Sequence, residues 1–144
     1  MGFEHKILLK DDAEPKIHKV RSGPLFLRQE LNDQMEKLVA AGIMEPIEAS
    51  PWISLIVVAH RSNGITRLCV DLRHLNKNIV IDQFPLPKIN EMVATLDGAR
   101  WFSTTDLSAA YYQIPLCEES KKFTAFITPF GCFQYKRMPF GLAS

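Results

Sequence analysis

The sequence predicts an α+β fold, because helical and strand patterns are mixed without the strict strand–helix alternation of a parallel α/β protein. Two predicted β-hairpins carry this inference, one over residues 53–72 and one over residues 121–141. The chain of 144 residues is long enough for one domain with a core. Its 47% hydrophobic and 23% charged residues are typical of an ordinary globular protein and argue against disorder.

The first forty residues predict an extended arm followed by a helix. The arm is charged and is interrupted by Pro15. Ser22 is the predicted N-cap of a helix that begins near Pro24, and Gly42 is its predicted stop. Apolar residues recur at helical spacing between these signals: Leu25, Leu31, Met35, Leu38 and Val39.

The first hairpin joins a buried strand at 53–59 to a strand at 67–72 through the turn R-S-N-G-I-T. Residues 76–87 contain two Pro and are expected to be irregular. A short helix is predicted from Ile89 to Leu96, because Asp97-Gly98 is a stop signal.

A strand is predicted from Trp101 to Asp106, with a helical turn from Ser108. The second hairpin turns at Pro129-Phe130-Gly131. The overall organisation is therefore helix, hairpin, short helix, strand and hairpin.

Bulk properties exclude several classes of protein. The formal net charge is +1, so no overall basic excess indicates nucleic acid, although a local patch remains compatible with it. The odd set of three Cys predicts reduced intracellular thiols. No apolar run approaches membrane-spanning length, and no targeting signal is visible at the start, so we expect an intracellular, cytoplasmic location.

Asp106 stands out as a lone carboxylate at the end of an apolar strand. A hard cation such as Mg²⁺ takes oxygen ligands in such a place, with Leu107 adding its backbone carbonyl. The competing interpretation is a turn cap at Ser108-Ala109, which local sequence alone favours. Tyr111 and Tyr112 follow; one of them can form a flat wall against a ligand, although core packing is the commoner role.

The segment from His60 to Lys77 is locally basic. It carries four Lys or Arg against one acid, Asp71, and such Arg residues can clamp phosphates or simply be solvated. Two smaller basic pairs, Lys121-Lys122 and Lys136-Arg137, are equally ambiguous. A phosphate-binding P-loop, a zinc motif and a nucleophile elbow are all absent from the sequence.

Four collinear blocks give the sequence a family resemblance. They are G-I-M-E-P-I-E-A-S-P-W-I-S, R-L-C-V-D-L-R-H-L-N-K, F-P-L-P-K-I-N-E-M-V-A-T-L-D-G-A-R-W-F-S-T-T-D-L-S-A-A-Y-Y-Q-I-P-L and F-T-A-F-I-T-P-F-G-C-F-Q-Y-K-R-M-P-F-G-L. In order and spacing they resemble the reverse transcriptase of retroviruses and of long-terminal-repeat retrotransposons of the Ty3/gypsy type. The resemblance covers the chain from about Gly23 to its end.

The resemblance implies a right-hand polymerase, with fingers and the first palm segment in this chain. By it, residues 1–22 are an N-terminal arm, 23–80 the first part of the fingers, 81–116 the first palm segment and 117–144 the returning fingers hairpin.

The resemblance also implies the chemistry of the site. Asp106 corresponds to the first catalytic carboxylate, on a palm strand, and Leu107 to the backbone ligand of two Mg²⁺ ions, with Mn²⁺ as an alternative ion. The implied nucleotide-binding residues are Arg67, Tyr111, Phe140 and, by a looser match, Arg61. The implied template-binding residues are Cys69, Arg73 and Gly141.

The sequence departs from the family pattern in one respect that bears on function. The family's aromatic-x-Asp-Asp pair is absent, since no Asp follows Asp106. We therefore expect a fragment of an RNA-directed DNA polymerase that is inactive alone. Its expected partners are an RNA or DNA template with primer, deoxynucleoside triphosphates and the remainder of a Pol polyprotein. The alternatives are a non-catalytic remnant that binds nucleic acid and one that binds a protein partner.

Overall fold

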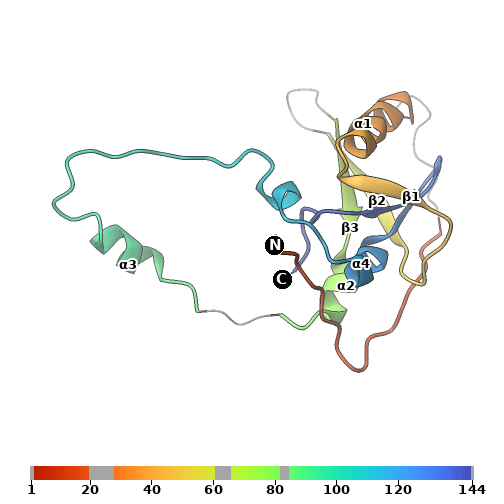
Figure 1. Cartoon of the computed structure of the whole chain (residues 1–144), viewed down its shortest axis with the longest axis horizontal. Coiled ribbons are helices and arrows are strands. Elements are labelled where there is room, and N and C mark those ends of the chain that lie inside the picture. The colour runs from red at the N-terminus through yellow and green to blue at the C-terminus, as the bar shows by residue number, and fades with distance from the viewer. Residues whose placement is uncertain (1, 20–27, 61–65, 82–84, 144) are drawn as a thin grey trace.

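The computed structural model describes residues 2–19, 28–60, 66–81 and 85–143, with the side chains of 58–60 and 66–67 outside the description. A mixed sheet with the strand order β1-β5-β4-β2-β3 forms the centre. Its strands are β1 (Met44–Ile47), β2 (Ser54–His60), β3 (Thr66–Asp71), β4 (Phe126–Thr128) and β5 (Gly131–Tyr135). Together with the helices packed on it, this sheet makes up what we call the sheet body (Figure 1). The α+β prediction is confirmed.

Both predicted hairpins are present. β2 and β3 pair antiparallel from Leu55–Asp71 to His60–Thr66, and β4 and β5 pair antiparallel around Gly131. Gly131 has φ 131°, a conformation that L side chains rarely adopt. The two hairpins join through a short parallel pairing of β2 with β4, in which Ser54 faces Phe126. Strand β1, which the sequence pattern did not reveal, completes the sheet against β5.

Helix α1 (Arg28–Ala40) confirms the first predicted helix from residue 28 onward; Ser22, Pro24 and Leu25 lie outside the described residues. Leu31 and Met35 are buried, and Gly42 ends the segment with φ 67°. Helix α2 (Arg73–Asn78) was not predicted and replaces the start of the expected irregular stretch. Its Leu75 is 1% exposed, so burial of one side chain holds a helix that local sequence did not indicate.

Four further short helices lie in the second half of the described chain. They are α3 (Ile89–Ala94), the 3₁₀ helix η2 (Ala110–Gln113), α4 (Glu118–Lys121) and the 3₁₀ helix η3 (Lys122–Thr124). The core lies between the sheet, α1, α2 and the chain end. Its members include Met44, Trp52, Phe126, Tyr135 and Met138.

The N-terminal arm is extended, as predicted, and lies against the sheet body. Isolated bridges join His5 to Leu116, Leu9 to Ile79 and Ile17 to Ile53. Figure 1 shows the arm passing α2 before it turns toward α1. No helix in the described part of the chain has both the length and the apolar character needed to cross a bilayer.

Residues 85–109, which we call the projecting segment, leave the sheet body as a wide loop that carries α3 (Figure 1). Every residue in this range is exposed. The predicted strand from Trp101 to Asp106 is wrong, because residues 101–107 have no regular structure. Within the described chain no strand pairs with them, and an unpaired strand would leave its backbone N–H and C=O groups without partners.

Candidate functional site

Asp106 lies on the projecting segment, not at the end of a strand, and its side chain is exposed. Leu107 beside it is 63% exposed. Among the described residues no group of three His, Cys, Asp or Glu side chains could hold a metal ion. Mg²⁺ requires a near-octahedral set of oxygen ligands, of which one carboxylate supplies a small part. The described residues therefore do not by themselves fit the two-ion site that the resemblance implies.

The turn after Asp106 returns the chain to the sheet body. Ala109 has φ 49° and ψ 46°, a left-handed conformation that is strained by roughly 1–2 kcal/mol for a residue with a Cβ. It opens η2, which carries Tyr111 and Tyr112. Strained backbone of this kind is concentrated at functional sites.

Tyr111 and Tyr112 both meet Phe140. Each ring centroid lies 5.0 Å from that of Phe140 in an edge-to-face arrangement. Tyr111 is 43% exposed and Phe140 51%, so this pair presents an aromatic surface to solvent. The structure thus brings together two of the predicted nucleotide-binding residues from positions 29 apart in the sequence.

Tyr112 is half-buried and packs against the core. Its ring stacks on Tyr135 at 6.3 Å with an interplanar angle of 21°. Burial raises the pKa of the Tyr135 hydroxyl, and the neighbouring Tyr112 adds to that effect. One Tyr of the pair therefore forms an outer wall while the other packs inward.

Arg137 contacts the backbone of η2, the short helix that carries both Tyr residues. Its Nη1 donates to the carbonyl oxygens of Tyr112 at 3.2 Å and of Gln113 at 3.3 Å. A charged donor on two carbonyls at the end of a short helix stabilises that end. Arg137 is thus engaged with the protein's own backbone.

Asn76 holds the segment that carries Phe140. Its Nδ2 donates to the Gly141 carbonyl at 2.8 Å, and its Oδ1 accepts from the Ala143 backbone N–H at 2.9 Å. Gly141 has φ 83°, so glycine is the residue suited to this turn. The predicted template residue Gly141 is therefore tied to α2 by a side chain that sequence reasoning missed.

A hollow of about 560 Å³ lies beside these aromatic rings. This volume is in the range of small-molecule sites. Its walls come from α1, β3, η2, β5 and the chain end: Gln34, Lys37, Leu38, Leu68, Cys69, Val70, Ala109, Tyr112, Tyr135 and Phe140. Lys37 is the one cation among these lining residues, and the other walls are largely apolar or aromatic.

Arg73 forms a two-pronged ion pair with Asp71. Its Nε donates to Oδ1 at 2.8 Å and its Nη2 to Oδ2 at 2.6 Å. The Arg73 guanidinium, chiefly through these hydrogen bonds, lowers the pKa of Asp71 to about 2. The Arg73 side chain is still 86% exposed, so its outer edge can meet a phosphate.

The remaining predicted residues lie on the first hairpin. Cys69 is exposed on β3, opposite Val57. The backbone of Arg67 pairs with Ala59, and its side chain lies outside the described residues. Arg61 lies outside them altogether. The structure therefore gathers Cys69, Tyr112 and Phe140 around one hollow, with Arg73 two residues beyond β3.

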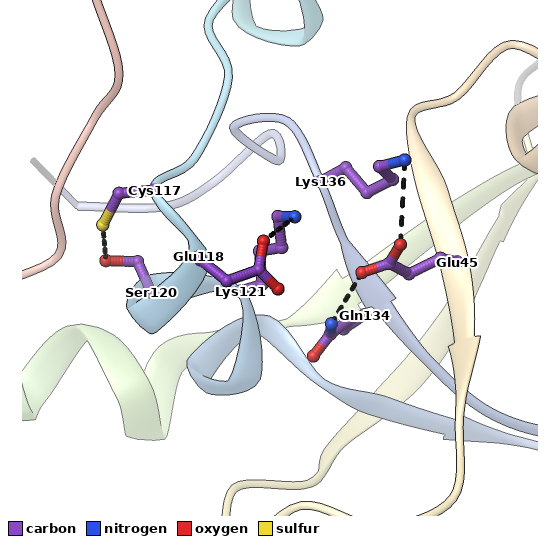
Figure 2. A network of polar contacts seen from close by, with 7 residues as sticks. All are labelled: Glu45, Cys117, Glu118, Ser120, Lys121, Gln134 and Lys136. Atoms are coloured by element: carbon purple, nitrogen blue, oxygen red, sulfur yellow. Dashed lines mark hydrogen bonds and ion pairs between the residues drawn. The ribbon is translucent and has the colours of Figure 1, made fainter.

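The two ambiguous basic pairs have mostly internal partners. Figure 2 shows Lys121 contacting Glu118, and Glu45 of β1 reaching both Gln134 of β5 and Lys136, which follows that strand. The Gln134 Nε2 donates to Glu45 at 2.8 Å, and the Lys136 ammonium lies 3.7 Å from the same carboxylate. Together with the Arg137 contacts, these partners argue for structural roles.

Sequence reasoning missed Asn76 and Lys37, and it left Arg137 as part of an ambiguous basic pair. The Asn of R-H-L-N-K and the Arg of Q-Y-K-R-M were both in view, but their partners are far away in the sequence. The position of Lys37 could be read from the sequence, because this residue lies in the last turn of the predicted helix, just before Ala41-Gly42. Nothing in the local pattern indicates that this helix packs beside β3.

Comparisons with known proteins show the family of the chain. The family model described as "Reverse transcriptase (RNA-dependent DNA polymerase)" matches residues 59–144. The chain belongs to the reverse transcriptase family. It is 34% identical over 145 aligned residues to the retrovirus-related Pol polyprotein from transposon 412 of Drosophila melanogaster, which covers 97% of this chain and 12% of that protein. The match to the corresponding polyprotein from transposon opus of the same organism is 36% identical and covers 90% of this chain and 13% of that one.

Solved structures of the reverse transcriptase family share the fold. The protease-reverse transcriptase of prototype foamy virus aligns with a TM-score of 0.82 at 22% identity, over 96% of this chain and 18% of that one. The foamy viral enzyme in complex with an RNA/DNA hybrid aligns with a TM-score of 0.77 at 17% identity, over 98% of this chain and 19% of that one. The chain spans about an eighth of the length of the curated relatives named above.

Proposed function

We propose that this chain supplies the fingers and the first palm segment of an RNA-directed DNA polymerase. In this assignment residues 1–22 are the arm, 23–80 and 117–144 the fingers, and 81–116 the palm segment. Its support is that β4 and β5 share one sheet with β2 and β3, whereas residues 85–109 lie outside that sheet.

The observation that carries the proposal is the meeting of Tyr111 and Phe140 beside a hollow that Cys69 also lines. Aromatic faces bind the sugar and base of a nucleotide, and an exposed guanidinium such as that of Arg73 binds the phosphates of a template. The foamy viral relatives whose structures contain double-stranded DNA or an RNA/DNA hybrid support a template–primer as the ligand of this face. Deoxynucleoside triphosphates are the second proposed ligand.

Catalysis requires more than the described residues. Asp106 would contribute one carboxylate toward Mg²⁺ or Mn²⁺, and the Leu107 carbonyl would be a second oxygen ligand. A bound divalent ion would supply charge stabilisation for nucleotidyl transfer. Because no Asp follows Asp106, we expect the chain alone to bind nucleic acid without extending a primer.

Titration of the chain with a fluorescent RNA/DNA hybrid at several salt concentrations tests the binding proposal. We expect the affinity to fall steeply with salt, and Arg73→Ala to reduce the slope of log K against log salt by about 0.9, the value for one lost phosphate contact. Lys88→Ala on the projecting segment is the matched control and should leave the slope unchanged. Salt-independent binding would instead favour the remnant that binds a protein partner.

Nucleotide binding separates the proposed roles of Arg67 and Asp106. Arg67→Ala should weaken deoxynucleoside triphosphate binding by ~1.5–3 kcal/mol, since a charge-assisted hydrogen bond is lost. Asp106→Ala should remove the Mg²⁺ dependence of that binding and leave the affinity for the hybrid near the wild-type value. Equal loss of both affinities would contradict the assignment of Asp106 as a metal ligand.

Translation of the transcript beyond the codon for Ser144 tests the polymerase assignment itself. An open frame that continues to an aromatic-x-Asp-Asp hairpin would make Asp106 one of three catalytic carboxylates. Primer extension by that longer protein, and its loss in Asp106→Asn, is the expected activity result. A stop codon at that point would restrict the function of the chain to binding.

A further inference from the structure

The chain leaves the sheet body at residues 78–80 and returns to it at residues 115–117, and we call these two places the feet of the projecting segment. The first foot lies at the end of α2 and the second just after η2. Each foot has one side chain in the core, since Ile79 is 3% exposed and Leu116 2%. Asp106 lies on the exposed chain between the feet, so its position depends on how they are held.

Residues 5–10 of the N-terminal arm, which we call the strap, pair with the second foot near their beginning. The His5 N–H donates to the Pro115 carbonyl at 2.8 Å, and the Cys117 N–H donates to the His5 carbonyl at 3.0 Å. These two hydrogen bonds enclose Leu116 in the way that a parallel strand pair does. The strap therefore adds a short strand-like element to this foot.

The strap pairs with the first foot near its other end. The Val80 N–H donates to the Leu8 carbonyl at 2.8 Å. The Lys10 N–H donates to the Asn78 carbonyl at 2.9 Å, and the residues between these bonds form an antiparallel bridge. Figure 1 shows the arm beside α2, where the projecting segment leaves the sheet body. One extended stretch of the arm therefore contacts both feet.

Burial of Ile7 anchors the strap between its two pairings. The Ile7 side chain is 4% exposed and belongs to the core, whereas its neighbour Leu8 is 55% exposed. The Ile7 N–H donates to the Oγ of Ser120 at 2.9 Å. Ser120 is 1% exposed, and its Oγ also lies 3.0 Å from the Sγ of Cys117 (Figure 2). Removal of the strap would take the Ile7 donor away from this buried hydroxyl, which is unfavourable.

The second foot has a further anchor in the chain that follows β5. The Leu116 N–H donates to the Lys136 carbonyl at 2.9 Å. The Met138 N–H donates to the Ile114 carbonyl at 2.8 Å. The strap thus ties the end of α2 to a foot that is already held by the sheet body.

We propose that residues 5–10 act as a strap that fixes the spacing of the two feet and so positions Asp106 relative to the Tyr111–Phe140 surface. This inference rests on the proposed catalytic role of Asp106 and names the residues that place its carboxylate. The Asp106 side chain is exposed, so its position is determined by the points at which the scaffold holds the ends of its loop.

Hydrogen exchange measured by mass spectrometry tests whether the strap holds the feet. Ile7→Ala withdraws the anchor of the strap. We expect amides of 78–80 and 115–117 to exchange about 10-fold faster in this variant, the change for the loss of one or two hydrogen bonds, while β2 and β3 keep their wild-type rates. Ile17→Ala is the matched control, because Ile17 lies on the same arm and is 65% exposed. Its exchange should equal that of wild type.

Ser120→Ala is a second variant that leaves the apolar anchor in place. It removes the hydroxyl that accepts from the Ile7 N–H, and we expect faster exchange at the same two feet. Circular dichroism and the urea midpoint verify the fold of every variant. Wild-type rates at both feet in folded Ile7→Ala, or in Ser120→Ala if Ile7→Ala does not fold, would overturn the strap.

Distances between spin labels measure the positioning itself. Labels on p-acetylphenylalanine at Glu48 in the sheet body and Thr104 in the projecting segment leave the native cysteines in place. We expect one distance maximum in wild type and a broader distribution in Ile7→Ala and Ser120→Ala. Labels at Glu48 and Phe130, both in the sheet body, are the control and should give the same distribution in every variant. A wild-type distribution for the first pair that is already as broad as that of the variants overturns the positioning role.

Binding of the RNA/DNA hybrid separates this inference from the proposed function. Arg73 lies at the other end of α2 from the first foot, so Ile7→Ala should bind the hybrid with wild-type affinity and salt slope. Loss of hybrid affinity in folded Ile7→Ala would assign the strap to ligand binding and overturn its positioning role. Salt-independent binding by wild type would count against the proposed function, while the exchange and distance results still decide on the strap.

Discussion

The sheet body and the projecting segment are built from similarly apolar sequence but have opposite surroundings. In the sheet body Phe126 and Ala125 are completely buried and Met44 is 1% exposed. In the projecting segment Trp101 is 93% exposed and Leu86 82%. Ile89, Met92, Val93 and Leu96 are spaced as one face of a helix, and each is at least 48% exposed.

This difference shows that an apolar pattern indicates burial only where a partner surface exists. The sheet body supplies its own partners, because its strands and helices pack against one another. For the projecting segment the described residues supply none. Apart from Ala109, the residues that line the hollow lie in the first region, while the proposed catalytic carboxylate of Asp106 lies in the second.

Hydrogen exchange gives the largest expected contrast between the two regions. Amides of β2 and β3 exchange only on opening of the sheet, whereas those of 85–109 have few backbone partners. We expect protection factors to differ by about 10³ or more for a body of ordinary stability, as measured by mass spectrometry. Comparable protection in both regions would show that the projecting segment packs in solution.

Truncation of one aromatic side chain in each region should change the free energy of unfolding by very different amounts. Phe126→Ala removes a ring with 0% exposure and should lower the free energy of unfolding by ~3–5 kcal/mol, through lost burial and a residual cavity. Trp101→Ala should change it by about 0.5 kcal/mol or less, because that ring is in solvent. Urea denaturation followed by circular dichroism measures both. A large loss in Trp101→Ala would reveal a contact for the projecting segment.

Asn76→Ala sharpens the comparison within the sheet body. The variant removes both hydrogen bonds that hold the Gly141–Ala143 turn and should cost ~1–3 kcal/mol of stability. Asn90 on the exposed helix α3 is the matched control, and Asn90→Ala should be close to neutral. If Asn76→Ala has the same urea midpoint as wild type, the packing of the chain end does not contribute to the stability of the core.

The Asp71–Arg73 pair gives the smallest effect, as a pH dependence. The folded-state pKa of Asp71 is depressed to about 2, so its contribution to stability is present above the unfolded pKa near 4 and is lost as the pH falls toward 2. Wild type should exceed Asp71→Asn in the free energy of unfolding at pH 5, and the gap should close by about pH 2. Urea melts of both variants across this range measure it, and a gap independent of pH would contradict the pairing.

The sequence by itself determined the local elements and the family. The α+β class, the extended arm, α1 from residue 28, both hairpins and the glycine stop at Gly42 follow from periodicity and turn chemistry, which act over a few residues. Four motif blocks then gave the family and named Asp106, Tyr111, Phe140 and Arg73 as candidates. The strand predicted at Trp101–Asp106 is wrong. A strand is stable only when another strand pairs with it, and the local sequence does not specify that partner.

Only the tertiary structure decided which distant residues meet. The parallel pairing of β2 with β4, the edge contact of Tyr111 with Phe140 and the hold of Asn76 on Gly141 join residues between 29 and 72 positions apart. Packing of the whole core fixes such contacts, and no local propensity encodes them. The same holds for the arm. Its extended path was predicted, but its approach to His74 depends on hydrogen bonds to Ile53, just before β2, and to helix α2, both of which follow the arm in the sequence.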